Sequence, residues 1–181
     1  MIDWTRTQRE ACPECGFDPA TVADPALGRA LTDSAADWGA LLAAHDAALL
    51  RIRPRPEVWA AVEYACHVRD VLGIFEERIR RTLTEHEPTL GWWDHEAAVE
   101  DDEYRSQDVV LLAEAIAANA RTLARTMASL DAAALERGAV RRPGETFTVR
   151  GMARFALHES VHHHRDAMMG LDDLGGPTMR A

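Results

Sequence analysis

The stretch from Thr148 to Met169 constrains the fold more than any other part of the chain, because it has a helical pattern with histidines on its apolar side. Thr148 can cap its N-terminus, and no proline follows before Pro177. Residues three and four apart share one face of a helix. His158 and His162 therefore lie one turn apart, on a stripe that also holds Met152, Phe155 and Met169.

Burying two imidazoles side by side is unfavourable unless their nitrogens find partners. A divalent metal is a suitable partner, since neutral imidazole is a common ligand and an i,i+4 pair can bind one ion. A third ligand must come from another element. His67 is the best candidate, because it lies on an apolar stripe of a second predicted helix with Val71 and Ile74. A satisfied core histidine is the alternative for His67 taken alone.

The length of 181 residues suits one domain, and the apolar periodicity predicts four long helices. They cover about residues 25–51, 57–86, 106–130 and 148–171. The expected fold is therefore all-α, a four-helix bundle over residues 24–171 with a long loop, 88–107, between the second and third helices. Pro143 and Gly144 mark a turn, so a small hairpin is expected before the last helix. Residues 1–23 are expected to form an arm and residues 172–181 a loose tail.

The net charge of −10 argues against a nucleic-acid partner, which needs a clustered basic surface. The chain shows no signal peptide and no apolar run of about 18 residues. We therefore expect a cytoplasmic protein without a membrane partner.

The cysteines are Cys12, Cys15 and Cys66, of which the first two form a Cys-x-x-Cys pair. A structural zinc site usually has a second pair of cysteines, and a thioredoxin-like redox pair needs a βαβ context. Neither is present. The sequence therefore favours a turn with two small buried side chains, and a redox or metal role is the alternative.

His158-Glu159-Ser160-Val161-His162 matches H-E-x-x-H, the zinc metalloprotease helix in which the glutamate is the general base. The metzincin extension needs a glycine at 165 and a histidine at 168, where this chain has Arg165 and Met168. The chain has no glutamate after Glu159, and little of it is predicted to be strand. A protease is therefore disfavoured, and Glu159 is expected beside the metal site or in its outer shell.

Several features together resemble the DinB/YfiT-like superfamily, which includes the metal-binding domain of mycothiol-dependent maleylpyruvate isomerase. They are Trp59-x7-His67, the long second connection, the Thr-Val-Arg-Gly start of the last helix, and His158-x3-His162-His163 followed by Asp166. The resemblance covers about residues 25–170 and leaves the Cys-x-x-Cys segment outside. It implies a four-helix bundle, frequent dimers, and zinc or nickel bound by His67, His158 and His162. His163 is expected outside the first shell.

The resemblance also implies thiol-dependent transferase or isomerase chemistry. Three histidines leave an open position, where a low-molecular-weight thiol such as mycothiol could be activated to attack a small electrophile. Trp92 and Trp93 either wall the pocket or pack against a helix end. Four carboxylates are candidates to orient the imidazoles from the second shell: Glu63, Asp70, Glu159 and Asp166. A metal-binding or stress-related module without turnover is the alternative function.

Overall fold

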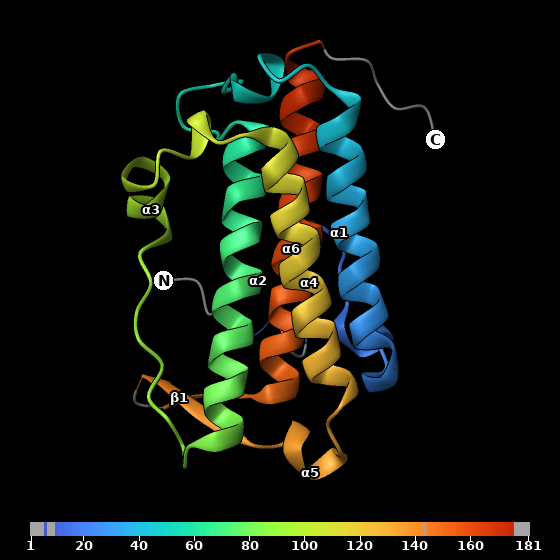
Figure 1. The fold of residues 1–181 in the computed structure, drawn as a ribbon, viewed down its shortest axis with the longest axis vertical. Coiled ribbons are helices and arrows are strands. Elements are labelled where there is room, and N and C mark those ends of the chain that lie inside the picture. Colours follow the sequence, from blue (N-terminus) through green and yellow to red (C-terminus); the bar gives the residue numbers. More distant parts are fainter. Residues whose placement is uncertain (1–5, 7–9, 143, 176–181) are drawn as a thin grey trace.

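The computed structural model describes residues 6, 10–142 and 144–175. Four long helices form a bundle, which confirms the expected all-α fold (Figure 1). In this view α1 and α6 run upwards and α2 and α4 run downwards. Their bounds are α1 (Leu27–Ala44), α2 (Ala61–Thr84), α4 (Val109–Ala128) and α6 (Val149–Asp173).

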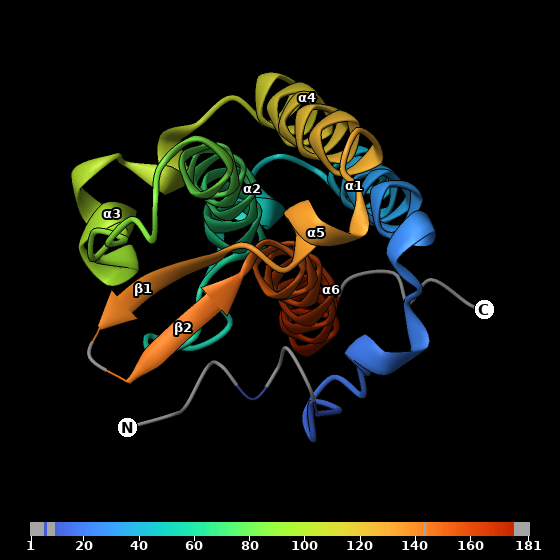
Figure 2. The same ribbon diagram turned by 90° about the horizontal axis from the view of Figure 1, so that it is seen from below.

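The order of the helices around the bundle brings α2 against α6. Helix α1 packs on α4 and α6, and α2 packs on the same two helices. Consecutive α1 and α2 therefore lie diagonally across the bundle (Figure 2). This arrangement places the His67 helix next to the helix that carries the histidine cluster.

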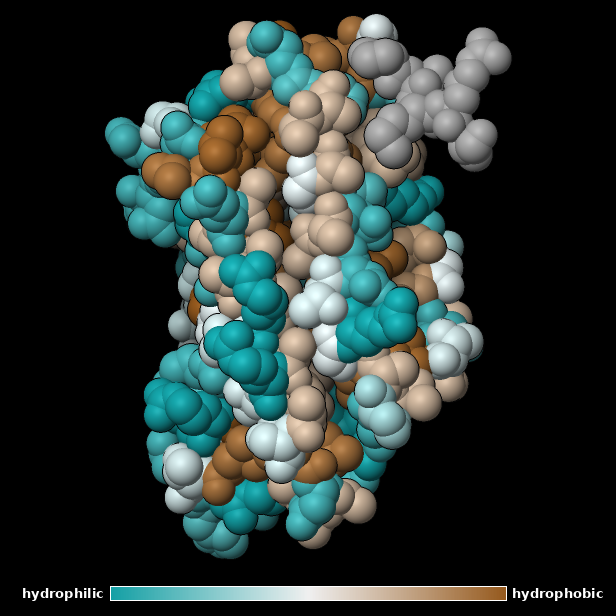
Figure 3. All heavy atoms as spheres, turned by 45° about the vertical axis from the view of Figure 1, so that its right-hand side comes forward, coloured by the Kyte–Doolittle hydropathy of each residue, from teal (hydrophilic) through white to brown (hydrophobic). Residues whose placement is uncertain are grey.

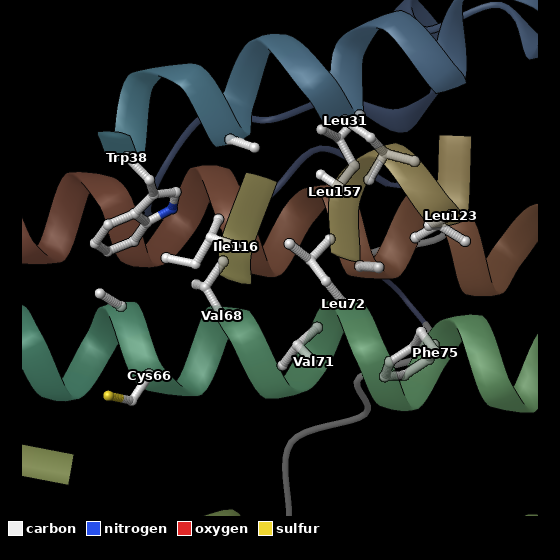
Figure 4. Close-up of a cluster of buried hydrophobic side chains, with 14 of the residues drawn as sticks. Leu31, Trp38, Cys66, Val68, Val71, Leu72, Phe75, Ile116, Leu123 and Leu157 are labelled. Carbon is white, nitrogen blue, oxygen red and sulfur yellow. The ribbon is translucent and has the colours of Figure 1, made fainter. Parts of the chain in front are cut away.

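The core lies between these helices, where side chains from α1, α2, α4 and α6 point into one layer (Figure 4). Trp38, Leu72 and Ile116 are buried. The indole Nε1 of Trp38 donates to the carbonyl oxygen of Ser160 at 3.0 Å, and the hydroxyls of Ser34 and Ser160 are 2.7 Å apart. The polar groups that enter the core from α1 and α6 thus satisfy one another.

Local sequence explains most helix boundaries. Thr148 caps α6 as expected, because its Oγ1 accepts from the backbone N–H of Gly151 at 3.0 Å. Asp108 caps α4 by accepting from the N–H groups of Val110 and Leu111. The first helix is shorter than predicted. It ends at Ala44, and a separate 3₁₀ turn, η4, covers Leu49–Arg51.

The connection between α2 and α4 contains helices where a loop was expected. Asp94 accepts from the N–H of Ala97 at 3.1 Å and so caps α3 (His95–Asp101), which is followed by the 3₁₀ turn η5 (Tyr104–Ser106). The predicted hairpin is present as antiparallel β1 (Gly138–Arg142) and β2 (Glu145–Thr148), with Gly138 opposite Thr148. Leu90 donates from its backbone to Val140 at 2.8 Å, so the hairpin holds the start of the connection. Figure 2 shows the hairpin and α3 on the same side of α2.

The remaining elements are short: η2 (Pro19–Thr21), η3 (Asp24–Ala26) and α5 (Ala132–Leu135). Figure 3 shows the side of α1 and α4, where a band of weakly hydrophobic residues runs between groups of hydrophilic ones. Of the helices in the described ranges, none combines the length and the apolar character needed to cross a bilayer. Residues 176–181, part of the predicted tail, lie outside the described residues.

Candidate metal centre and pocket

Helices α2 and α6 bring one group of possible metal ligands together: His67, Glu159 and His163. His67 and Glu159 are almost fully buried. The Trp93 ring stacks on His67 at 5.3 Å with an interplanar angle of 9°, and the Trp59 ring lies 5.5 Å away. His163 stacks on Tyr64 at 5.3 Å. Aromatic rings from α2, its N-terminal flank and the connection thus fix both imidazoles.

The distances within this group fit ligands of one ion better than they fit direct hydrogen bonds. The Nε2 atoms of His67 and His163 both lie 3.4 Å from Oε2 of Glu159. Charge-assisted N–H···O bonds are shorter, about 2.7–2.9 Å. Two ligands at about 2.0–2.1 Å from a tetrahedral zinc are about 3.3–3.4 Å apart. The three side chains therefore fit a divalent metal.

A carboxylate also orients His163. Oδ2 of Asp166 lies 3.1 Å from Nδ1 of His163, which leaves Nε2 to face Glu159. Ligating histidines typically place their second nitrogen on such an acceptor. Nδ1 of His67, by contrast, has no hydrogen-bond partner among the described residues.

The charges of this group follow from burial and from mutual contact. Burial favours the neutral form of Glu159, but His158, His163 and His67 outweigh it and hold the pKa of this carboxyl well below its ordinary value. Burial lowers the pKa of His67, so its imidazole is neutral and able to ligate. Burial also opposes protonation of His163, but Asp166 and Glu159 raise its pKa to about 9. Without a metal, this site therefore pairs an ionised carboxylate with a protonated imidazole.

A cavity of about 510 Å³ opens onto this group. It follows one face of α2 over three turns, from His67 past Val71 and Phe75 to Arg78. Helix α6 contributes Phe155, Glu159, His163 and Asp166, and the connection contributes Trp92 and Trp93. Both tryptophans thus line the pocket, and Trp92 is largely exposed. The volume is in the usual range for small-molecule sites, about 300–1,000 Å³.

The sequence led us to expect that His67 converges with His158 and His162. In the structure these residues lie in two different groups. The two α6 histidines belong instead to a second group, with Cys12 and Cys15. A helix turns about 100° per residue, so the stripe of positions 159 and 163 points in a different direction from that of 158 and 162. The stripe that faces α2 contains Phe155, Glu159 and His163. His163, expected outside the first shell, lies within this group.

Two further carboxylates predicted near the metal have other partners. Glu63 accepts from Arg53 at 2.6 and 2.7 Å and from the N–H of Ala60 at 2.8 Å. Asp70 accepts from Arg69 and from the Tyr104 hydroxyl. Both oxygens of each group are therefore used to fix loops and side chains around α2.

The metalloprotease arrangement also fails on geometry. In H-E-x-x-H enzymes the two histidines ligate while the glutamate faces the substrate as a base. Here Glu159 faces the pocket, and His158 and His162 face the N-terminal segment.

The model of the DinB superfamily matches residues 30–167. The chain belongs to this superfamily. A search of curated proteins finds no match. Among solved structures the fold is similar to that of YfiT from Bacillus subtilis, described as a probable metal-dependent hydrolase with an unusual four-helix bundle topology. The TM-score is 0.80 at 16% sequence identity, over 92% of this chain and 95% of YfiT.

Proposed function

We propose that this DinB protein is a metal-dependent enzyme that acts on a small molecule in the α2–α6 pocket. The observation that carries the proposal is the spacing of His67, Glu159 and His163 beside an open cavity. Their ligand atoms lie within 4.8 Å of one another, and each Nε2 lies 3.4 Å from Oε2 of Glu159. Two histidines and one glutamate are the ligand set of several catalytic zinc centres, which keep one position open. Zinc is therefore the first candidate, and nickel the second.

A bound divalent metal would supply a Lewis acid that lowers the pKa of a thiol or a water beside it. The chain's own residues would prepare the site. Asp166 would accept a hydrogen bond from Nδ1 of His163, and the Trp93 ring, stacked on His67, would hold that imidazole in place. We propose a low-molecular-weight thiol of the mycothiol type as the nucleophile, in an S-transfer or a thiol-dependent isomerisation. This choice rests on the resemblance that the sequence shows.

The far end of the pocket indicates the kind of electrophile that would fit. Val71 and Phe75 separate the metal end from Arg78, and Arg141 lies on the Trp92 ring at 5.7 Å. Burial and the neighbouring Arg141 both lower the pKa of Arg78. An anionic group would relieve this repulsion. We therefore propose an electrophile with an apolar body and an acidic group.

Hydrolysis is the second candidate, since the similar YfiT is described as a probable metal-dependent hydrolase. The same three ligands would then activate water instead of a thiol. A metal-binding module without turnover is the remaining outcome.

The test uses protein purified without a histidine tag and supplied with zinc or nickel. We expect thiol-dependent turnover of an acidic electrophile. It should appear as thiol consumption in an S-transfer, or as an isomerised product without net thiol consumption in an isomerisation. Both should be lost in His67→Ala and His163→Ala together with the pocket metal. His86→Ala is the matched control, because this exposed histidine lies outside the pocket. Hydrolysis of ester and amide substrates without thiol would favour the second candidate. Activity retained in both pocket variants would contradict the proposal.

A further inference from the structure

The Cys-x-x-Cys pair forms a tight turn that presents both sulfurs to α6. The N–H of Cys12 donates to the carbonyl of Phe17 at 2.7 Å, and the N–H of Gly16 donates to the carbonyl of Cys12 at 2.9 Å. Gly16 has a φ of +76°, which a side chain would disfavour. The N–H of Phe17 reaches Sγ of Cys15 at 3.4 Å. The turn thus folds the chain back on itself and directs backbone donors at sulfur.

On the α6 side, two imidazoles meet this turn. Nδ1 of His162 lies 3.7 Å from Sγ of Cys12. His158 also interacts with the Cys12 thiol, and it is only 1% exposed. Its Nε2 is buried without a hydrogen-bond partner among the described residues. A buried imidazole nitrogen left without a partner beside two thiols points to a missing ligand, because such a group is costly to bury alone.

The second nitrogen of each imidazole rests against a carboxylate. Nδ1 of His158 is 3.2 Å from Oε1 of Glu159, and Nε2 of His162 is 3.3 Å from Oδ2 of Asp166. This carboxylate–histidine arrangement is typical of zinc ligands, since it fixes the tautomer and the ring orientation.

We propose that Cys12, Cys15, His158 and His162 bind one structural zinc ion, separate from the pocket metal. Their four ligand atoms all lie within 4.8 Å of one another. A sulfur at about 2.3 Å and a nitrogen at about 2.0–2.1 Å from a tetrahedral zinc are about 3.6 Å apart, close to the separation of Cys12 and His162. Two cysteines and two histidines fill all four positions, which is the mark of a structural site rather than a catalytic one.

The two thiols differ in acidity when no metal is bound. Burial raises the pKa of Cys12, but the N–H groups of Cys15 and Glu14 and the imidazoles of His158 and His162 outweigh it and lower the pKa to about 6. Burial raises the pKa of Cys15 to about 11, so this thiol would release its proton when it coordinates. The zinc would fasten the segment that holds Cys12 and Cys15 to α6. Figure 2 shows the N-terminal part of the chain beside that helix.

The first measurement needs no variant. X-ray absorption at the zinc edge of wild-type protein, purified without a histidine tag, should show sulfur neighbours at about 2.3 Å. Substitution with cobalt should give a thiolate-to-metal charge-transfer band. Zinc coordinated by nitrogen and oxygen alone, or a Cys12–Cys15 disulfide in protein purified under reducing conditions with zinc supplied, would overturn the proposal.

Variants assign the ligands and separate this site from the pocket. The double variant Cys12→Ser/Cys15→Ser should lose one zinc per chain and all sulfur scattering. The single variant Cys66→Ser should keep that zinc and its sulfur scattering. Cys66 is the matched control, since it is buried elsewhere and faces the carbonyl of Tyr104. His67→Ala should retain the sulfur-bound zinc even if the pocket binds no metal. Sulfur scattering that persists in the double variant would contradict the assignment.

Discussion

At the scale of single residues, Glu159 stands where two groups of donor atoms meet. Oε1 lies 3.2 Å from Nδ1 of His158, and Oε2 lies 3.4 Å from Nε2 of His67 and of His163. One carboxylate can thus ligate the pocket metal and orient a histidine of the proposed zinc site. Asp166 bridges the groups in a similar way, since its Oδ2 contacts His162 and His163.

Asp166→Asn should therefore weaken both metals. Both imidazoles contact the same oxygen, and an amide oxygen in its place would carry no charge, so the two rings lose a shared orienting anion. Removing such a partner typically costs about 10- to 100-fold in metal affinity. Competition with a chromophoric chelator measures both affinities. Asp172→Asn, at an exposed position on the same helix, is the control and should change neither. Equal affinities in the Asp166 variant and the wild type would remove this bridging role.

At the scale of elements, α6 carries its polar residues on two neighbouring faces, and the positions that form one face follow those of the other by one residue. Periodicity and the Thr148 cap predicted this helix correctly, and the sequence also predicted that its histidines face a metal. It did not determine which histidines face α2. A rotation of about 100° exchanges the pair 158/162 for the pair 159/163, and apolar residues flank both stripes.

The signal that would have separated the pairs was the Cys-x-x-Cys segment. Two cysteines with two residues between them and two histidines with three residues between them have the spacing of a Cys2His2 zinc site. The two halves lie at opposite ends of this chain, so only the packing of the N-terminal segment on α6 brings them together. Local sequence carries no information on that long-range contact. It likewise did not reveal α3, whose Asp94 cap stood unrecognised within the predicted loop.

Thr148→Ala tests the start of α6. Losing the Oγ1 contact with the N–H of Gly151 should lower the free energy of unfolding by about 1 kcal/mol, within a range of roughly 0.5–2 kcal/mol. Thr148→Ser keeps the hydroxyl and should stay close to wild type. Urea denaturation followed by circular dichroism compares the three proteins. If serine is as destabilising as alanine, the cap is not the cause.

At the scale of the whole molecule, the diagonal placement of α1 and α2 lets α6 contribute residues both to the pocket and to the contact with the N-terminal segment. Because α2 packs on α6, its His67 meets the 159/163 face, and the hairpin and α3 lie on the same side of α2. The N-terminal segment meets the neighbouring face of α6 through Cys12 and Phe17, whose ring lies 5.8 Å from that of His158. The bundle thereby places the pocket group and the proposed zinc site on neighbouring faces of α6, joined through Glu159 and Asp166.

The most direct test of this account is a crystal structure of zinc-loaded protein with anomalous data collected at the zinc edge. We predict a peak in the α2–α6 pocket, within about 2.0–2.2 Å of Nε2 of His67, Nε2 of His163 and a carboxylate oxygen of Glu159. A pocket peak coordinated by His67, His158 and His162 would contradict the account, as would the absence of any peak beside His67 in protein that holds zinc.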